Sequence, residues 1–397
     1  MAEHIDTRHT NVVVIGGGYA GVTAANRLTQ RDDVDVTVIN PRPVFVERIR
    51  LHQLVGGSDD AVVDYGDLLA VRIRLIVDTV TQIDARERTL TLASGGSVEY
   101  DYLIYAVGSQ PAHPKVPGAS DFAYPIASYE QASMLRPVVN AAQADAPITV
   151  VGAGPTGIET AAELAETGRR VTLLCGGALG PYLHPRVRKA LAKRLTKLGV
   201  RVLDGADSTV TRVTADAVTL GSGREIASAV TIWTAGFTVP DLAIRSGLTT
   251  DAMGRLITDE TLTSVDDEHI VAAGDSAAPS DLPFRMSCQA AGPLGAHAAD
   301  TALSLIAGED AAPVAMRFFG QCISLGRRWG VFQFARGDDR PVSLHIGGRA
   351  GAVLKALVCW FTVKQLANEA RKPGRPSIVS FGADHSRQER LRGKVEA

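Results

Sequence analysis

Two glycine-rich segments constrain the fold of this chain more than any other feature. Each follows a run of β-branched residues and opens an alanine-rich stretch, which is the strand–turn–helix context of a dinucleotide-binding fingerprint. The glycines permit a tight turn and the close approach of a pyrophosphate, and the helix N-terminus stabilises the phosphate charge. They are Gly16, Gly18 and Gly21 in VVVIGGGYAG, and Gly152, Gly154 and Gly157 in ITVVGAGPTGIE. Two copies predict two bound dinucleotides, most economically a flavin and a nicotinamide.

The composition is that of an ordinary globular protein. The chain has 397 residues, a net charge of −2 and 45% hydrophobic residues, which suits two or three domains. No basic excess points to nucleic acid, and the polar start MAEHIDTRHT does not resemble a secretory signal. The cysteines lack CxxC or zinc spacing, so we expect reduced thiols, no metal site and a cytoplasmic location. They are Cys175, Cys288, Cys322 and Cys359.

The order of strand and helix signals predicts an α/β fold with two Rossmann-like domains and a C-terminal α/β cap. NVVVIG, GYAGVTAANRLTQ and VDVTVIN form one βαβ unit, and a second begins near Ile148. The segment DEHIVAAGDSA then returns to the first domain, so the second domain is inserted in it. We expect the first domain in 1–113 and 251–310, the second in 114–250, and the cap in 311–397. The tail past Arg371 is expected to be disordered.

Five motifs support a resemblance to a known family. GGGYAG and YDYLIYAVGS come first, GAGPTGIE and TIWTAGF follow, and HIVAAGDSA comes last. In this order they resemble the two-dinucleotide flavoprotein reductases of the pyridine nucleotide-disulfide oxidoreductase fold, and more narrowly the type II NADH dehydrogenase-like group. The resemblance implies FAD in the first domain and NADH or NADPH in the second.

The motifs also indicate which residues contact each ligand. The FAD set is Gly16, Gly18, Gly21, Asn40, Ala106, Gly108, Gly274 and Asp275. The NAD(P)H set is Gly152, Gly154, Gly157, Glu159 and Gly236. The resemblance implies that Asp275 hydrogen-bonds the ribityl chain of the flavin.

The ends of the second strands depart from the usual pattern. Asp or Glu normally binds the ribose hydroxyls there, but this chain has Asn40 in the first domain and Cys175 in the second. An amide can still accept a hydrogen bond from a hydroxyl, so FAD remains expected. Arg186 and Arg188 lie downstream, and they either reach a 2′-phosphate or form the solvated face of a helix. NADH is favoured over NADPH by the resemblance alone.

The segment after Asn40 bears on the chemistry at the flavin. Disulfide reductases of this fold carry a CxxxxC pair in a window that here spans residues 48–53 and holds no cysteine. Because thiol–disulfide exchange needs a thiolate, a disulfide substrate is disfavoured. The charged residues of the window either face solvent and pair with one another or act at the flavin. In the second case Arg48 stabilises the anionic reduced ring, or His52 relays a proton.

Glu159 follows the second fingerprint by two residues. It resembles a family glutamate that lies near the nicotinamide, where a carboxylate orients the carboxamide or assists proton movement. The alternative is an early-helix glutamate favoured by the helix dipole. The predicted catalytic residues are therefore Glu159, Arg48 and His52.

The electron acceptor is the least constrained part of the prediction. The family carries a glutamine-rich AQxxxQ stretch at the quinone end, whereas PFRMSCQAAGPLGAHAAD holds only Gln289. The segment IGGRAGAVLKALVCWFTVKQLANEARK is apolar but bordered by cations, and we expect it to be too short and too charged to span a bilayer. Such a segment fits a helix lying on the inner membrane surface. A core-packing or homodimer helix fits it equally well.

These observations predict an FAD-dependent NAD(P)H dehydrogenase. Hydride passes from the nicotinamide to FAD, and electrons then pass to a quinone-like acceptor without a redox disulfide. Two alternatives stay open at this point. One is a soluble reductase of a ferredoxin- or rubredoxin-like protein, and the other is a redox-sensing nucleotide-binding flavoprotein.

Overall fold

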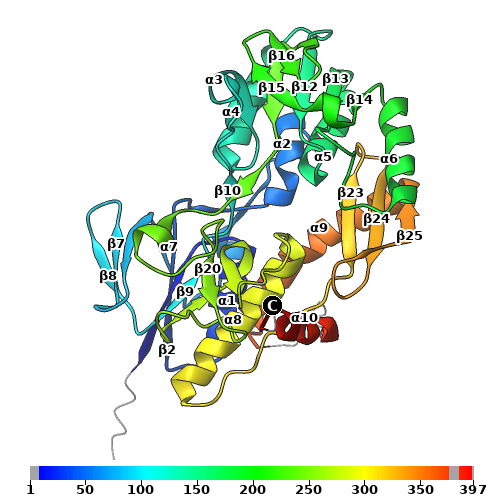
Figure 1. Cartoon of the computed structure of the whole chain (residues 1–397). Helices are drawn as coiled ribbons and strands as arrows, with labels where there is room; N and C mark the ends of the chain where they lie inside the picture. The colour runs from blue at the N-terminus through cyan, green and yellow to red at the C-terminus, as the bar shows by residue number, and fades with distance from the viewer. Residues whose placement is uncertain (1–8, 375–383, 396–397) are drawn as a thin grey trace, which may run out of the picture.

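A computed structural model describes residues 9–374 and 384–395 of the chain (Figure 1). Its first domain is built on a five-stranded parallel sheet of order β21-β9-β1-β2-β5. The central strand β1 is fully buried at Val12, Val13 and Val14, as expected for a parallel strand covered on both faces. The strands are β1 (Thr10–Ile15), β2 (Val34–Asn40), β5 (Arg74–Val77), β9 (Tyr102–Tyr105) and β21 (Ile270–Ala272).

Helices and a small sheet cover the two faces of this first sheet. Helices α1 (Tyr19–Leu28) and α8 (Cys288–Ala307) pack together on one face. The antiparallel sheet of β6 (Val80–Asp84), β7 (Thr89–Leu92) and β8 (Ser97–Glu99) joins the apolar core on the other face. Shorter elements complete the domain: β3 (Val44–Val46), η1 (Arg48–Arg50), α2 (Leu51–Gly56), β4 (Val62–Asp64), η2 (Tyr65–Asp67), β20 (Leu256–Thr258), η4 (Gly274–Ser276) and β22 (Ala277–Pro279).

The second domain repeats the plan with a parallel sheet of order β11-β18-β12-β13-β14. Its strands are β11 (Ala123–Pro125), β12 (Pro147–Val151), β13 (Arg170–Leu174), β14 (Arg201–Leu203) and β18 (Val230–Trp233). Its helices are α3 (Ala119–Phe122), α4 (Tyr129–Ala141), α5 (Pro155–Glu166) and α6 (Pro185–Lys197). A meander of β15 (Val210–Val213), β16 (Ala217–Leu220) and β17 (Glu225–Ala227) follows η3 (Ala206–Ser208).

The chain crosses between the two domains twice, and the crossings are paired. The outgoing strand β10 (Gln110–Pro111) and the returning strand β19 (Phe237–Thr238) form a short antiparallel ribbon. After the return, α7 (Leu242–Arg245) packs on β6, and β21 joins the first sheet beside β9. The second domain is therefore inserted in the first, and the predicted fold class is confirmed. The boundaries at residues 113, 250 and 310 stay predictions.

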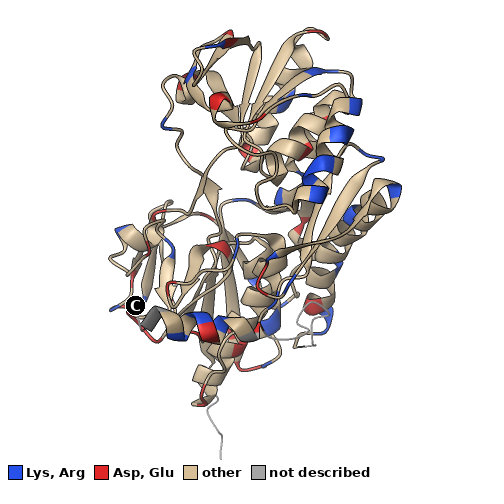
Figure 2. Ribbon diagram, turned by 45° about the vertical axis from the view of Figure 1, so that its right-hand side comes forward, with Lys and Arg blue, Asp and Glu red and all other residues tan. Residues whose placement is uncertain are grey.

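The C-terminal cap contacts both domains. It consists of an antiparallel sheet of β23 (Gly320–Ser324), β24 (Gly330–Ala335) and β25 (Pro341–Gly347), followed by α9 (Gly348–Arg371). Helix α9 packs on β24 and α1, β23 packs on α5, and α6 packs on β25. Lys and Arg residues recur along α6 and on the cap beside it (Figure 2).

The tail past Arg371 is in part ordered, contrary to expectation. Helix α10 spans His385–Val395, and residues 375–383 and 396–397 lie outside the described part of the chain. Arg387 is buried, pairs with Glu260 at 2.7 Å and lies over the ring of Phe284. A buried, paired arginine that contacts an aromatic ring explains why this polar segment packs.

Candidate functional site

The first glycine loop joins β1 to α1. Gly16 has φ +104°, and a Cβ there would lie 2.3 Å from the Ala106 carbonyl oxygen. A Cβ on Gly21 would lie 1.8 Å from the Gly16 carbonyl oxygen, so only glycine lets helix and strand approach this closely. At Gly18, which begins the helix, a Cβ would meet nothing within 4 Å. The open helix N-terminus therefore has room for a pyrophosphate, as FAD requires.

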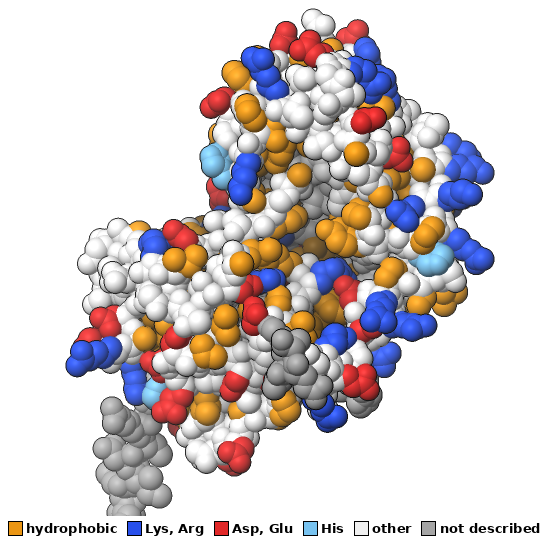
Figure 3. Space-filling view, in the orientation of Figure 1, with side chains coloured by type: hydrophobic (Ala, Val, Ile, Leu, Met, Phe, Trp, Pro, Cys, Tyr) orange, Lys and Arg blue, Asp and Glu red, His pale blue; other side chains and the backbone are white. Residues whose placement is uncertain are grey.

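The second loop has the same construction between β12 and α5. Gly152 has φ +116°, and a Cβ there would lie 2.5 Å from Thr234 Oγ1. A Cβ on Gly157 would lie 1.9 Å from the Gly152 carbonyl oxygen, whereas one on Gly154 would meet nothing within 4 Å. Both loops follow the carboxyl ends of parallel strands, and the surface between the two domains is hollowed (Figure 3). Both loops fit a dinucleotide pyrophosphate on geometric grounds.

Asn40 and Tyr65 hold the first loop. Asn40 Oδ1 accepts from the Gly17 N–H at 2.9 Å, and Asn40 Nδ2 donates to the Arg42 carbonyl at 2.8 Å. The Tyr65 hydroxyl donates to the Gly17 carbonyl at 2.7 Å. Both atoms of the Asn40 amide thus bond the protein backbone, and its predicted bond to a ribose stays a prediction. Tyr65 has no sequence signal, because it enters the site from a separate turn.

Asp275 is brought together with Arg48 through a serine. Ser109 Oγ donates to Asp275 Oδ2 at 2.7 Å, and Arg48 Nη1 donates to Ser109 Oγ at 3.0 Å. Arg48 Nη1 lies 4.0 Å from Asp275 Oδ2 and 4.0 Å from where a Cβ on Gly108 would be. Burial lowers the pKa of Arg48, but a guanidinium stays charged. The predicted flavin end therefore holds one cation and one carboxylate, bridged by Ser109, which the motifs did not single out.

An unpartnered hydroxyl also faces this region. Tyr19 is the first residue of α1, is 8% exposed, and packs edge-on against Phe45 with ring centroids 5.0 Å apart. Within the described residues its hydroxyl has no hydrogen-bond partner. A buried hydroxyl without a partner, near enough to Arg48 to influence its pKa, fits a bound group that carries polar atoms.

Glu159 lies in a buried polar junction, which we define as Glu159, His52, Ser324 and Lys355. Lys355 Nζ is 3.1 Å from Glu159 Oε1, and the Ser324 N–H donates to the same oxygen at 2.8 Å. His52 Nδ1 is 3.8 Å from Glu159 Oε2, and its Nε2 is 3.2 Å from Ser324 Oγ. The four side chains come from α2, α5, β23 and α9. The junction thus joins both nucleotide domains to the cap.

The charges of this junction are set by burial and by mutual attraction. Burial alone would lower the pKa of Lys355, but the Glu159 carboxylate raises it above the usual value. Burial alone would raise the pKa of Glu159, but Lys355 holds it below the usual value. Burial lowers the pKa of His52 to about 4, so the imidazole is neutral near pH 7. The junction is an ion pair with a neutral histidine beside it.

Two glycines of the predicted ligand-binding sets remain, and they lie in different turns of the chain. Gly274 has φ +72° and precedes Asp275, while Gly236 has φ +86° and lies where the chain returns through β19.

The charged window after Asn40 pairs partly within itself. Arg50 pairs with Glu47 at 2.9 Å and with Asp59 at 3.0 Å, as expected for charges that pair with one another. The predicted catalytic residues therefore separate: Arg48 joins Asp275, whereas His52 joins Glu159. Their catalytic roles stay predictions.

Gln289 ties α8 to the cap. In the amide orientation that satisfies both atoms, it donates to the Gly320 carbonyl at 2.9 Å and accepts from the Phe319 N–H at 3.2 Å. Its neighbour Cys288 also starts α8, and burial raises the pKa of the Cys288 thiol. Gln289, the single glutamine of this stretch, therefore links α8 to the cap through these two hydrogen bonds.

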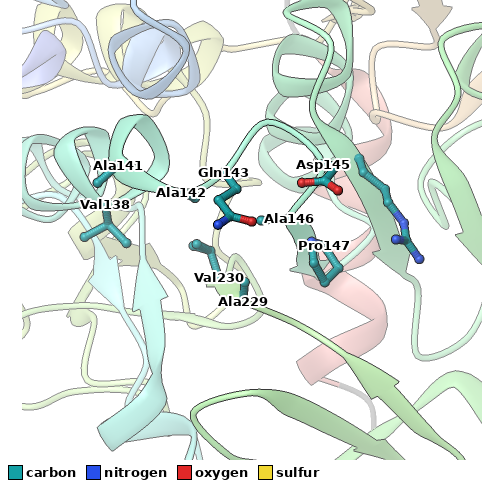
Figure 4. Close-up of a pocket in the computed structure, with 10 residues that line it drawn as sticks. Val138, Ala141, Ala142, Gln143, Asp145, Ala146, Pro147, Ala229 and Val230 are labelled. Carbon is teal, nitrogen blue, oxygen red and sulfur yellow. The ribbon is translucent and has the colours of Figure 1, made fainter.

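A surface hollow of about 740 Å³ lies elsewhere (Figure 4). It is lined by Val138, Gln143, Asp145, Pro147, Arg170 and Val230, among others. Pro147, Arg170 and Val230 begin strands β12, β13 and β18. The hollow is therefore at the amino edge of the second sheet, opposite the edge where the glycine loops lie, and it does not belong to the site.

Comparison with known proteins agrees with this geometry. The family model for pyridine nucleotide-disulphide oxidoreductases matches residues 10–300. An NADH dehydrogenase-like protein of Mycobacterium tuberculosis is 33% identical, over 73% of this chain and 79% of its own length. A type II NADH:quinone oxidoreductase of the same species is 29% identical, over 70% of this chain and 69% of its own.

A solved structure shows the same fold over nearly the whole chain. The sulfide:quinone oxidoreductase of Aquifex aeolicus has a TM-score of 0.78 and 18% identity, covering 95% of this chain and 99% of its own. The matched glycine loops, the inserted second sheet and the relatives agree on one assignment. The chain belongs to the pyridine nucleotide-disulphide oxidoreductase family, in its NADH dehydrogenase-like group, and is an oxidoreductase that uses FAD and NADH.

Proposed function

We propose that this enzyme takes hydride from NADH onto FAD and passes the electrons to a quinone. The observation that carries the proposal is the pair of open glycine loops, built alike on two sheets that a single ribbon connects. FAD, when bound, supplies the hydride-accepting and electron-donating chemistry. The relative at 29% identity from Mycobacterium tuberculosis is an NADH:quinone oxidoreductase, which supports the acceptor class.

The residues of this chain position the ligands and hold charge. The open N-termini of α1 and α5 would hold the two pyrophosphates, and Asp275, which accepts a hydrogen bond from Ser109, would hold the ribityl chain. Arg48, which donates to the same serine, keeps a positive charge at this end of the site that would stabilise negative charge on the flavin. In the buried polar junction, Lys355 Nζ lies 3.1 Å from Glu159 Oε1, which places an ammonium group against a carboxylate in the first turns of α5, just after the second glycine loop.

The positions and protonation of the cysteines support an electron acceptor that is not a disulfide. All four are free, and none lies in the window of residues 48–53. Burial raises the pKa of Cys288, Cys322 and Cys359, so these thiols are protonated near pH 7. A protonated thiol is a poor nucleophile for disulfide exchange. In the proposed reaction, electrons would therefore pass from the flavin to the acceptor without a thiol intermediate.

Anaerobic reduction followed by reoxidation tests this function. The purified holoprotein is mixed with NADH without oxygen, and flavin absorbance is followed before quinones, a ferredoxin and a rubredoxin are added in turn. We expect complete bleaching by NADH and rapid reoxidation by quinones. Reoxidation by the iron–sulfur proteins alone would replace the quinone with a protein acceptor. Tight NADH binding without turnover by any acceptor would favour a sensor instead.

The cap presents an apolar surface that we propose binds the inner surface of a membrane. Val353, Leu357 and Trp360 are more than half exposed and recur at helical spacing on α9. Contrary to expectation, this 24-residue helix is long and apolar enough to span a bilayer by length and composition. Its Lys355 nevertheless pairs with Glu159, so the helix lies along the protein. Exposed apolar residues, a tryptophan and flanking cations fit an interfacial helix.

A vesicle flotation assay tests the apolar surface. We expect Leu357→Ser with Trp360→Ser to abolish flotation with lipid vesicles while FAD content and turnover of a soluble quinone stay unchanged. Met134→Ser is the matched control, because Met134 is 69% exposed on α4 of the second domain. Unchanged flotation of the double variant would contradict the proposal. A shift from dimer to monomer in light scattering, without any flotation of wild type, would assign the surface to a homodimer.

A further inference from the structure

The edge of the second sheet lacks the acidic residue that usually binds the ribose and so distinguishes NADH from NADPH. Cys175 follows β13, where a carboxylate normally binds the ribose hydroxyls. Burial, and secondarily the charge of Asp204, raises the pKa of Cys175 to about 12. A protonated thiol is only a weak hydrogen-bond partner. It therefore discriminates poorly between a ribose hydroxyl and a 2′-phosphate.

The neighbouring strand places a carboxylate beside Cys175. Strands β13 and β14 are parallel, with Leu174 opposite Leu203, and the Cys175 N–H donates to the Leu203 carbonyl at 2.9 Å. The residue after Leu203 is Asp204, and it is exposed. Because parallel strands end at the same edge of a sheet, Asp204 lies at the edge where Cys175 lies.

Hydrogen bonds between the two following loops hold this arrangement. The Gly205 N–H donates to the Gly177 carbonyl at 2.7 Å, and the Gly176 N–H donates to Ser208 Oγ at 3.0 Å. Ser208 Oγ in turn donates to the Gly205 carbonyl at 2.7 Å. A Cβ on Gly177 or Gly205 would meet nothing within 4 Å, so the surface beside Asp204 is open. The backbone that carries Asp204 is therefore held in place, and Asp204 itself is exposed and accessible to a ligand.

We propose that Asp204 replaces the missing carboxylate of β13 and sets the preference for NADH. Its oxygens accept hydrogen bonds from the ribose hydroxyls of the adenosine, and its charge repels the 2′-phosphate of NADPH. This assignment rests on the proposed function only in taking a nicotinamide dinucleotide as the substrate. It makes Asp204 a specificity-determining residue supplied by the adjacent strand.

Steady-state kinetics with both nucleotides test the assignment. For wild type we expect kcat/KM to favour NADH. For Asp204→Asn we expect the ratio of kcat/KM for NADH to that for NADPH to fall at least tenfold. Asp207→Asn is the matched control, because Asp207 is an exposed acid three residues further along the same loop. A ratio within twofold of wild type in Asp204→Asn, or a wild-type preference for NADPH, would overturn the proposal.

A rescue variant and a binding measurement separate this proposal from the proposed function. Cys175→Asp introduced into Asp204→Asn restores a carboxylate at the usual strand end, and we expect it to recover the NADH preference. Calorimetric titration with ADP-ribose and 2′-phospho-ADP-ribose measures the same selectivity without turnover. If NADH never reduces the flavin, the proposed function fails while the titration still tests Asp204. Equal affinities for the two ligands in wild type would refute the role of Asp204.

Discussion

Lys355→Met is expected to destabilise the folded enzyme by about 3–5 kcal/mol, the usual cost of removing one partner of a buried ion pair. The Glu159 carboxylate would remain 6% exposed without its cation, and the Ser324 N–H would be its main remaining donor. The cap would then separate from α5 more readily. Glu159→Gln with Lys355→Met removes both charges, and we expect the double variant to recover most of the loss.

Denaturant unfolding and amide hydrogen exchange measure this effect. The Ser324 amide reports on the junction directly, because it donates to Glu159, and its protection should fall in Lys355→Met. Arg349→Met is the control, since Arg349 is exposed on the same helix and surface changes usually stay within about 0.5 kcal/mol. A Lys355→Met protein as stable as the control would show that the ion pair is not a structural element.

Alanine in the glycine loops should remove one ligand at a time. In Gly21→Ala the new Cβ would lie 1.8 Å from a backbone oxygen of the first loop, and in Gly157→Ala 1.9 Å from one of the second. Such overpacking costs about 1–3 kcal/mol, and if the loop relieves it by leaving its ligand-binding geometry, the same free energy corresponds to a loss of affinity of roughly fivefold to roughly 140-fold. We expect Gly21→Ala to be purified with little FAD. Gly157→Ala should retain FAD and lose affinity for NADH.

Two measurements assign each loop to its ligand. Flavin absorbance gives the FAD content, and calorimetry with ADP-ribose gives binding at the second loop. Gly96→Ala is the control, because a Cβ there lies at an ordinary 3.8 Å from Leu92. Loss of FAD from Gly157→Ala and its retention by Gly21→Ala would reverse the assignment of the two domains.

The parts of the fold that depend on local pattern were predictable. Each glycine loop is encoded within about a dozen consecutive residues, and both parallel sheets and the insertion follow from the order of those units. Asp275 could be predicted as a ligand contact because its motif is contiguous, and that role stays a prediction. Ser109, which bridges Arg48 to Asp275, is the last residue of the YDYLIYAVGS motif but carries no signal of its own.

The parts that depend on distant partners were not predictable from pattern. Lys355 interrupts an apolar stretch that was expected either to lie on a membrane surface or to pack in a core or homodimer, and no pattern predicted its partner; it is buried because Glu159 neutralises it. The usual pattern places a ribose-binding carboxylate only at the end of β13, whereas Asp204, the residue proposed for this role, reaches the same edge from β14. In both cases strand or helix packing, rather than sequence spacing, brings the groups together.

The buried polar junction also has a consequence for synthesis of the chain. Ser324 lies 165 residues after Glu159 and 272 residues after His52. On the ribosome the earlier domains emerge and fold first, so the Glu159 carboxylate stays hydrated until β23 and α9 arrive. Closure of the cap dehydrates that charge only once its cation is in place. A nascent chain that stops before Lys355 therefore keeps this junction open to water, and the synthesis of α9 is the step that allows it to close.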